Sequence, residues 1–312
     1  FDTVMDAFGG TGAVSHYLKA MGKQVTYNDR LRFNWSIGVA LIQNSGVTLN
    51  PHDVAALLET HDVEYPDFIQ RTFNDIYFYA DENAWLDRTL YNIRHFLDDP
   101  YKQALANFAL FQACIAKRPY NLFHRANLYM RTAEVERSFG NKNTWDTPFE
   151  AHFRLFVDEA NAAVFDNGRE NRALNLDVMD APTGANLVYL DPPYLNAQGK
   201  GVDYREFYHF LEGMMNYDSW EREVDFKSKH RRLRLEPSLW LQPKTINRAF
   251  EAVIERYAGS IIVISYRSDG IPSADELVSL LKRHKKRVEK VVQAQKYVLS
   301  NRESHELLLI AP

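Results

Sequence analysis

The sequence has a single cysteine, Cys114, among its 312 residues. A lone cysteine excludes both a disulfide framework and a metal site built from cysteines, and it fits the reducing cytoplasm. No apolar run is long enough to span a bilayer and no signal-peptide pattern opens the chain, so we expect no membrane partner. Internal repeats and low-complexity segments are also absent. These absences fit an ordinary globular protein, and we expect it to work in the cytoplasm.

Positive charge is not in excess, because the formal net charge is -4. A negative sum argues weakly against a nucleic-acid partner, but the charges are unevenly distributed. The strongest basic cluster lies in a poorly periodic segment that we expect near the ligand side of the predicted sheet, and it contains Lys227, Lys229, Arg231, Arg232 and Arg234. We expect these cations to contact phosphate groups. A second cluster, 282–287, ends a predicted helix and is expected to complement its dipole at the surface.

The first thirty residues have the pattern of an opening βα unit. An apolar strand over 1–8 enters a glycine-rich turn, and a helix over 13–21 follows, with Val14, Leu18 and Met21 on one face. A second strand, 24–27, ends near Asp29, and an acid at this place commonly binds ribose hydroxyls. On its own, this pattern also fits a nicotinamide-dependent dehydrogenase.

The most informative stretch is 187–194, where four apolar or aromatic residues precede Asp191-Pro192-Pro193-Tyr194. The apolar run predicts a buried parallel strand, and the two prolines prevent both helix and further strand pairing. We therefore expect Asp191 to point into a site beyond the carboxyl end of the sheet. The carbonyl groups of Asp191 and Pro192 lack the usual partners. Together with the tyrosine, they suit a flat base that carries an amino group.

Asp191-Pro192-Pro193-Tyr194 resembles the catalytic motif of the amino-group, adenine-specific DNA methyltransferases of the D12 or Dam-like class. The run from Asp6 to Gly12 resembles the Asp-x-Phe-x-Gly-x-Gly signature of the same family. The resemblance implies S-adenosylmethionine as cofactor and S-adenosylhomocysteine as product. It also implies which residues form the cofactor pocket. Asp6 would lie near the amino-acid end of the cofactor, and the wall would be formed by Phe8, Gly10 and Gly12. Asp29 would hold the ribose, and Asp177, which follows a third strand, would contact the adenine.

The resemblance further implies that an adenine flips out of duplex DNA into the site. Asp191 and the Pro192 carbonyl would accept the two amino hydrogens, Tyr194 would stack on the base, and no metal would be required. No conventional metal-ligand cluster appears in the sequence. Double-stranded DNA and a cognate restriction endonuclease are the partners implied, in a prokaryotic cytoplasm.

The expected fold is α/β: a class I methyltransferase Rossmann-like, mostly parallel sheet with an antiparallel C-terminal strand and a large helical insertion. We expect a catalytic domain of 1–49 and 172–312, and an insertion of 50–171 that takes the place of a target-recognition region. Helices are predicted over 82–97, 101–117 and 148–165, the last with a capping box at Thr147. Most aromatic residues of the insertion are expected in its own core, and Arg118, Arg125 and Arg131 are available for DNA. The chain should close with a strand over 260–266, a helix over 272–281 and a hairpin of 288–298 with 305–310.

Several alternatives remain open at this point. The acid-Pro-Pro-aromatic motif also suits methylation of adenine in RNA or of the cytosine amino group, although an Asp at position 191 favours adenine. A cofactor-binding specificity subunit without activity is a further alternative, and the intact motif argues against it. Relatives carry a segment before the first strand that completes the methionine pocket, so we expect weak cofactor binding by this chain if that segment is needed.

Overall fold

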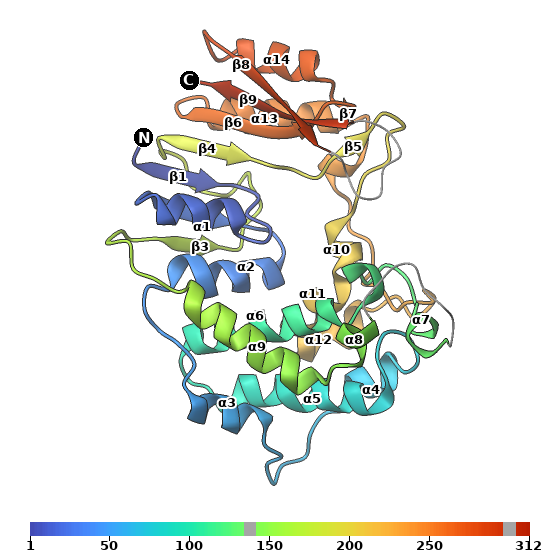
Figure 1. Ribbon diagram of the computed structural model, residues 1–312. Helices are drawn as coiled ribbons and strands as arrows, with labels where there is room; N and C mark the ends of the chain where they lie inside the picture. Colours follow the sequence, from blue (N-terminus) through green and yellow to red (C-terminus); the bar gives the residue numbers. More distant parts are fainter. Residues whose placement is uncertain (134–141, 296–303) are drawn as a thin grey trace. The chain divides into compact units, whose positions relative to one another are not determined.

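The computed structural model describes residues 1–133, 142–295 and 304–312. These residues group into two compact units (Figure 1). Unit 1 comprises Phe1–Gly38, Asn167–Tyr204 and Glu236–Pro312, and unit 2 comprises Val39–Asp166 and Arg205–Leu235. The units differ from the domains expected from the sequence mainly at 205–235, a segment that groups with the helices.

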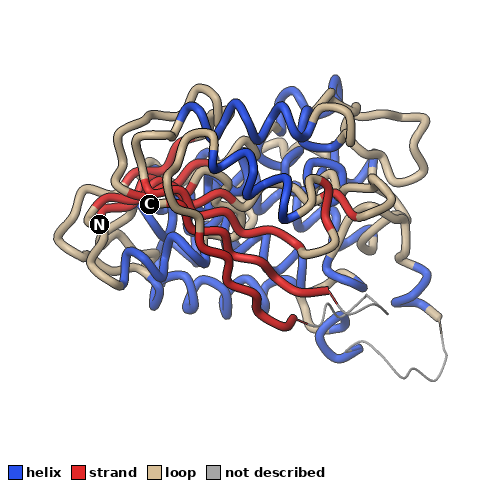
Figure 2. The backbone as a smooth tube through the Cα atoms, turned by 90° about the horizontal axis from the view of Figure 1, so that it is seen from above, coloured by secondary structure: helices blue, strands red, loops and turns tan. Residues whose placement is uncertain are grey.

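Seven strands of unit 1 form one twisted sheet (Figure 2). Their bounds are β1 (Thr3–Asp6), β2 (Gln24–Asn28), β3 (Arg172–Leu174), β4 (Leu187–Leu190), β6 (Ile261–Arg267), β8 (Glu289–Gln295) and β9 (Ser304–Ala311). The strand order is β3-β2-β1-β4-β6-β9-β8, and β9 runs antiparallel to both of its neighbours. The other described pairs of this sheet are parallel, which confirms the predicted α/β fold with an antiparallel C-terminal strand.

The predicted terminal hairpin is present as β8 and β9, and its expected residues 296–298 lie outside the described part of the chain. A separate two-stranded sheet pairs β5 (Leu195–Asn196) with β7 (Gly270–Ile271). It follows the Asp191 motif directly, so the chain after β4 is fixed against the loop that follows β6.

Helices cover both faces of the seven-stranded sheet. The helical segments of unit 1 are α1 (Ala13–Ala20), α2 (Arg32–Gly38), the 3₁₀ turn η3 (Leu239–Leu241), α13 (Ile246–Arg256) and α14 (Ala274–Lys282). On one face, α13 and α14 pack against Met5, Val188 and Ile262. On the other face, Val4 and its neighbours on β4 and β6 pack with Leu18 of α1. Successive strand residues point to opposite sides of the sheet, so Val4 and Met5 are buried on different faces.

The interior face of α1 differs from the prediction. Met21 is 53% exposed, because the helix ends at Ala20, and Ser15 and Lys19 are buried in its place. The sequence pattern follows apolar residues only, whereas this helix packs beside the end of β1, where a buried carboxyl group needs a hydroxyl partner. The predicted apolar face was therefore wrong at Met21.

Unit 2 is built from helices. They are the π-helical turn η1 (Val39–Gln43), α3 (Pro51–Leu58), α4 (Phe68–Thr72), α5 (Ala80–His95), α6 (Pro100–Ala116), the 3₁₀ turn η2 (Pro119–Asn121), α7 (Tyr129–Thr132), α8 (Lys142–Asp146), α9 (Phe149–Ala163), α10 (Tyr204–Phe207, which begins in unit 1), α11 (His209–Met215) and α12 (Tyr217–Glu223). The three predicted long helices are confirmed as α5, α6 and α9. Buried rings, among them Phe73, Tyr77 and Phe210, contact one another in the core of this unit, as expected.

Side-chain caps form at the start of several helices, but not at the one place where the sequence predicted a capping box. Asn50 forms a capping box with Asp53, and Ser273 caps α14. The capping box predicted at Thr147 does not form, because the Thr147 hydroxyl donates instead to the carbonyl oxygen of Asn143, 2.8 Å away in α8. A Ser or Thr hydroxyl can bond a carbonyl one turn earlier as readily as it caps.

Candidate active site

Two acidic side chains follow neighbouring parallel strands at the centre of the sheet. β1 ends at Asp6, and Asp191 follows Leu190, the last residue of β4. Asp6 is paired with Tyr189, so Asp191 lies two residues beyond that pair. The strand order reverses between β1 and β4, since β2 and β3 lie to one side and β6 to the other. Ligands of open α/β sheets bind at such a reversal, outside the carboxyl ends of the strands.

Asp6 is buried and only half satisfied. The Ser15 hydroxyl donates to its Oδ2 over 2.7 Å, whereas its Oδ1 has no hydrogen-bond partner among the described residues. Burial raises the pKa of Asp6 to about 7, and the negative charges of Asp191 and Asp29 add to this effect against the Ser15 hydrogen bond. A buried carboxyl oxygen without a partner is costly, and a cation or donor of a ligand would satisfy it.

The loop after β1 brings its backbone close to β2. Gly9 packs on the ring of Tyr27, where a Cβ would lie only 2.0 Å from Cε2. Gly10 and Gly12 have φ angles of +52° and +78°, in the left-handed region that favours glycine. A Cβ on Gly10 would meet no atom closer than 3.9 Å. Gly9 thus has a packing role, whereas Gly10 borders open space that a ligand can occupy.

Asp29 holds this loop from the end of β2. Its Oδ2 accepts from the backbone N–H of Gly10 at 2.9 Å and from Asn34 Nδ2 at 3.1 Å, and its Oδ1 accepts from the Leu31 N–H at 2.8 Å. Burial raises the pKa of Asp29, and these hydrogen bonds oppose the rise. A carboxylate offers about four lone-pair sites. Asp29 therefore retains capacity for one more donor, such as a ligand hydroxyl.

The Asp191 motif forms its own hydrogen bond. The Tyr194 hydroxyl donates to Asp191 Oδ1, and the Tyr194 ring packs edge-on against Tyr266, with 5.1 Å between ring centroids. Burial raises the pKa of Asp191 to about 6; the Tyr194 hydrogen bond opposes this, and the charge of Glu306 adds to it. None of the described residues donates to Asp191 Oδ2 or to the carbonyl oxygen of Pro192. Both atoms can accept hydrogen bonds from a substrate amino group.

Sequence reasoning missed Glu306. Its Oε1 accepts from the Ser265 hydroxyl at 2.7 Å and lies 3.2 Å from the oxygen of the Tyr194 hydroxyl. Glu306 reaches the site because β9 lies next to β6, where it pairs opposite Arg267. The one available signal was an acid directly before the apolar run of the terminal strand.

Phe8 and Asp177 occupy different surroundings. Phe8 packs edge-on against Trp240, at a centroid distance of 5.1 Å, beside the loop that it precedes. Asp177 is exposed and lies in a turn three residues after the end of β3. The side chain of Asn28 fastens this turn, because it donates to the carbonyl oxygens of Ala7 and Leu176 at 3.2 and 3.1 Å. Asn28, also missed in the sequence, thus joins the ends of β1 and β2 to the Asp177 turn.

The predicted basic cluster lies in unit 2, outside the sheet unit in which the sequence placed it. Its segment folds back on itself through a bridge between Val224 and Leu233. Lys227, Lys229 and Arg234 are exposed. Arg232 instead pairs with Glu206 at 2.9 Å, and Arg231 donates to the carbonyl oxygen of Phe226. The cluster therefore contains three exposed cations and two that make contacts within the unit.

Two of the three arginines expected for DNA are buried. Arg118 and Arg131 are only 1% and 2% exposed, whereas Arg125 is exposed. Arg131 forms a two-pronged ion pair with Glu82, at 2.7 and 2.8 Å, and Lys117 joins the same carboxylate at 2.8 Å. Arg118 and Arg131 thus hold unit 2 together, and the expectation that they are available for DNA was wrong.

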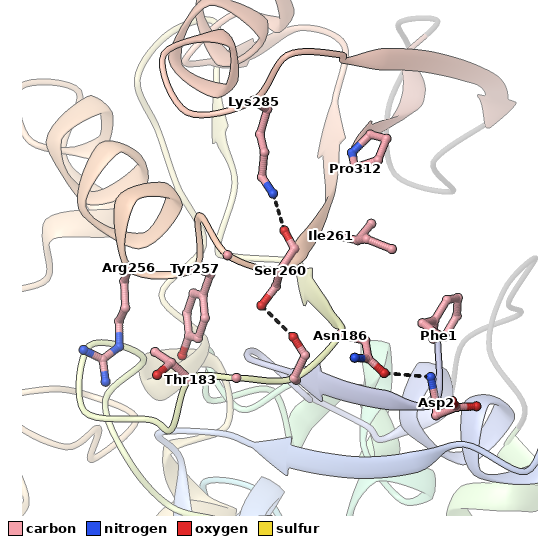
Figure 3. Close-up of a pocket in the computed structure, with 13 residues that line it drawn as sticks. Phe1, Asp2, Thr183, Asn186, Arg256, Tyr257, Ser260, Ile261, Lys285 and Pro312 are labelled. Atoms are coloured by element: carbon pink, nitrogen blue, oxygen red, sulfur yellow. Dashed lines mark hydrogen bonds between the residues drawn. The ribbon is translucent and has the colours of Figure 1, made fainter.

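A pocket of about 760 Å³ lies elsewhere in unit 1 (Figure 3). It is lined by Asp2, Asn186 and Ser260, each of which immediately precedes a strand of the sheet. The pocket therefore lies at the amino ends of β1, β4 and β6, at the opposite edge from Asp6 and Asp191. Its hydrogen bonds, including one from the Asp2 N–H to Asn186 Oδ1 at 2.9 Å, join those strand starts. None of the predicted site residues lines it.

Within the described ranges, no group of three or more His, Cys, Asp or Glu side chains is arranged to hold a metal ion. The helices of the same ranges include none with the length and apolar character that a membrane crossing requires.

Comparisons with known proteins agree on one family. A family model described as D12 class N6 adenine-specific DNA methyltransferase matches residues 1–234. The type II methyltransferase M2.HphI of Haemophilus parahaemolyticus is 29% identical over 97% of this chain and 87% of its own length. The type II methyltransferase M.FokI of Planomicrobium okeanokoites and the modification methylase LlaI of Lactococcus lactis subsp. lactis are each 24% identical over 90% of this chain. The matched regions are 42% and 44% of those two proteins, so the chain spans less than half of their length.

Proposed function

We propose, from the premise that the chain belongs to the family of D12 class N6 adenine-specific DNA methyltransferases, that unit 1 binds S-adenosylmethionine and presents Asp191 to an adenine flipped out of duplex DNA. DNA adenine methylation is the activity of this family, and a methyl donor is required for it. The observation that supports the site assignment best is the juxtaposition of Asp6 and Asp191 where the strand order reverses.

The residues at the end of β1 and β2 fit the cofactor. Gly10 borders open space, and Asp29 retains a lone pair for a ribose hydroxyl. The unpaired Oδ1 of buried Asp6 suits the positively charged amino group of the methionine portion. Phe8 and Gly12 complete this wall, and the Asp177 turn is assigned to the adenine of the cofactor. When bound, S-adenosylmethionine supplies an electrophilic methyl group on a sulfonium.

Asp191 and Pro192 hold the adenine amino group. The amino nitrogen is a poor nucleophile because its lone pair is delocalised into the ring. Asp191 Oδ2 accepts one amino hydrogen and the Pro192 carbonyl oxygen accepts the other, which favours a pyramidal nitrogen with a localised lone pair. Tyr194 stacks on the base, and Pro193 keeps the backbone rigid. Asp191, with its pKa near 6, takes up the proton that the nitrogen loses after transfer.

Two experiments test this assignment. The protein is incubated with methyl-tritiated S-adenosylmethionine and either unmethylated duplex DNA or RNA, and the labelled nucleoside is identified. We expect N6-methyldeoxyadenosine. Label found only in RNA, or only in deoxycytidine, would overturn the assignment of DNA adenine as the substrate. We also expect Asp191→Asn to lower kcat by about a thousandfold, an effect of about 4 kcal/mol, while S-adenosylhomocysteine still raises the melting temperature. Retained turnover would overturn the role of Asp191.

The exposed cations of unit 2 are the proposed contacts to DNA phosphates. Lys227, Lys229 and Arg234 are exposed and meet this requirement. Arg231 and Arg232 support the same segment from within. The names of the relatives, which include a modification methylase, favour a role beside a cognate restriction endonuclease in a prokaryotic cytoplasm. DNA methylated by this chain should then resist one endonuclease of matching recognition sequence and remain sensitive to others.

A further inference from the structure

One buried hydroxyl in unit 2 joins three separate segments. Tyr77 is fully buried, and its hydroxyl lies 2.6 Å from the carbonyl oxygen of Phe123, 2.7 Å from His209 Nε2 and 2.8 Å from the carbonyl oxygen of His230. Phe123 belongs to the loop 118–125, and His230 lies in the hairpin 224–233, whose ends are bridged. The Tyr77 hydroxyl therefore links this loop to this hairpin, and His209 of α11 lies between them.

The number of protons at this junction fixes the state of His209. The Tyr77 hydroxyl has one hydrogen, yet two carbonyl oxygens lie within its reach. His209 Nε2 is also 3.1 Å from the Phe123 carbonyl oxygen, and His209 Nδ1 has no partner among the described residues. Both carbonyl groups are satisfied only when Nε2 carries the hydrogen and donates toward Phe123 while Tyr77 donates to His230. Tyr77 and His209 thus act as one unit.

The loop 118–125 is held in an unusual conformation. The buried guanidinium of Arg118 lies 4.3 Å from the centre of the Tyr77 ring and donates to the carbonyl oxygens of Leu122 and Arg125, each at 3.0 Å. Between these anchors, Tyr120 and Asn121 have φ angles of +64° and +58° and are exposed. Residues other than glycine rarely adopt these backbone angles. The anchors therefore hold a strained backbone on which the side chains of Tyr120 and Asn121 are exposed.

The two segments carry mainly positive charge, although the whole chain has a formal net charge of -4. The loop 118–125 contains no Asp or Glu, and the hairpin 224–233 contains one acid, Asp225, which lies 3.6 Å from Arg232. Their exposed cations include Arg125, Lys227 and Lys229. A polyanion is the partner that such segments fit, with cations for its phosphates and an exposed aromatic ring for a base.

We propose that Tyr77 and His209 are positioning residues that lock the loop 118–125 and the hairpin 224–233 into one surface for duplex DNA. This proposal rests on the proposed function, because it deepens how that function is served. Neither residue is exposed, so neither touches DNA. Their effect is to fix both segments before DNA arrives, so that binding does not have to order them.

The test compares Tyr77→Phe with Tyr65→Phe. The Tyr65 hydroxyl also makes two hydrogen bonds in unit 2, from the His61 N–H at 2.9 Å and to Asn92 Oδ1 at 3.1 Å, but it contacts neither segment. We measure the Kd for unmethylated duplex DNA by fluorescence anisotropy with S-adenosylhomocysteine present, together with KM, kcat and amide hydrogen exchange. For Tyr77→Phe we expect Kd and KM for DNA to rise roughly three- to tenfold, as for the loss of one hydrogen bond.

In the same variant, kcat and S-adenosylhomocysteine affinity should stay within twofold, and exchange should accelerate in both segments. Tyr65→Phe should change none of these. His209→Gln keeps a donor near the position of Nε2 and should retain DNA affinity, whereas His209→Leu should resemble Tyr77→Phe. If Tyr77→Phe does not fold, the comparison of His209→Gln with His209→Leu tests the positioning role instead.

The positioning role would be overturned if Tyr77→Phe and Tyr65→Phe lost DNA affinity equally. It would also be overturned if DNA affinity were unchanged in both Tyr77→Phe and His209→Leu. The double variant Lys227→Ala, Lys229→Ala separates this failure from failure of the proposed DNA contact. If that variant loses DNA affinity while Tyr77→Phe does not, the hairpin binds DNA without being locked. If the double variant has no effect, the proposed contact itself is wrong, and the positioning role for DNA falls with it.

Discussion

The two units bury charged side chains in opposite ways. In unit 1, Asp6, Asp29 and Asp191 lie around the ends of the central strands, and none of them forms an ion pair among the described residues. In unit 2, the buried cations Lys117 and Arg131 share the carboxylate of Glu82. A buried charge is costly unless it is paired. In unit 2 the carboxylate of Glu82 meets this cost, whereas in unit 1 neither Asp6 Oδ1 nor Asp191 Oδ2 has a donor among the described residues, and the proposed function assigns both to ligands.

Whether a buried charge has a partner within the protein distinguishes a structural role from a proposed functional one more clearly than residue type does. Arg118, Arg125 and Arg131 look equivalent in the sequence, yet two of them are buried with their donors directed at Glu82 or at backbone carbonyl groups. Acids whose pKa is raised by burial and by neighbouring acids are candidates for binding or catalysis, because a bound cation or hydrogen-bond donor offsets the cost of their buried charge. The predictions below test this contrast from both sides.

Removal of the paired carboxylate should have the largest effect on stability. Glu82→Gln leaves Lys117 and Arg131, each with a side chain 1% exposed, without their countercharge. Breaking a buried ion pair from one side typically costs about 3–5 kcal/mol. We expect a loss of this size in the free energy of unfolding, measured by urea denaturation followed by circular dichroism.

The control for this prediction is Glu150→Gln. Glu150 pairs with Arg154 at 2.9 Å on the exposed surface of α9, with both side chains 52% exposed. An exposed pair of this kind contributes about 0–1 kcal/mol. If the two substitutions cost the same, the buried charges of unit 2 are not held by Glu82.

Removal of an unpaired carboxyl group should instead stabilise the protein, and the gain should depend on pH. The pKa of Asp6 rises from 3.8 to about 7 on folding, because the group is buried and lies near two other acids. Well below pH 3.8 the group is protonated in both states. As the pH rises to about 7, the unfolded chain releases this proton first, so the free energy of unfolding falls by up to about 4 kcal/mol. Asp6→Asn removes this loss and keeps an acceptor for Ser15.

The measurement is the melting temperature of the two proteins between pH 4 and pH 8 without cofactor. The advantage of Asp6→Asn should grow from pH 4 to about pH 7 and then level off. The same variant should bind S-adenosylhomocysteine more weakly, because it lacks the negative charge that is proposed to bind the amino group of the ligand. A variant that is less stable than the natural chain throughout this range would contradict the idea that the Asp6 charge is uncompensated.

Asp191, the proposed catalytic carboxylate, should set the acidic limb of the pH–rate profile. Asp191 must be ionised to accept the amino hydrogen, and its pKa is raised to about 6 by burial, with a further contribution from Glu306. We expect kcat to fall about tenfold per pH unit below pH 6. Glu306→Gln removes a negative charge beside Asp191, so the limb should move to lower pH. Glu289→Gln, on the exposed part of β8, should not move it, and equal shifts in both variants would remove Glu306 from the site.

How much of this site the sequence could predict depends on how local each feature is. Asp6 ends β1, and Asp29 and Asp191 follow β2 and β4, so the local pattern of strand, turn and acid was sufficient to place these side chains at the ends of strands, while their roles stay predictions. Glu306 was missed because it enters the site only through the pairing of β9 with β6, which joins residues about forty positions apart.

The basic residues show the second limit. Sequence gives their charge but not their burial, so Arg118 and Arg131 were expected to be available although both are buried. The hairpin 224–233 was expected with the sheet, because its neighbours in sequence belong there. Its contacts with Tyr77 and Glu206, which place it in unit 2, are made by residues that no local pattern brings together.

The smallest predicted effect separates the exposed cations of this hairpin from the paired one. Each phosphate contact that is lost lowers the slope of log Kd against log salt by about 0.9. Lys227→Ala with Lys229→Ala should therefore reduce the slope by about 2, with equal losses of affinity for DNA of any sequence. Arg232→Gln should leave the slope unchanged, because Arg232 is already paired with Glu206 and Asp225, and should lower the melting temperature instead. A lower slope for Arg232→Gln would mean that this cation leaves its carboxylates for DNA, and the separation between structural and functional charge would then fail within unit 2 itself.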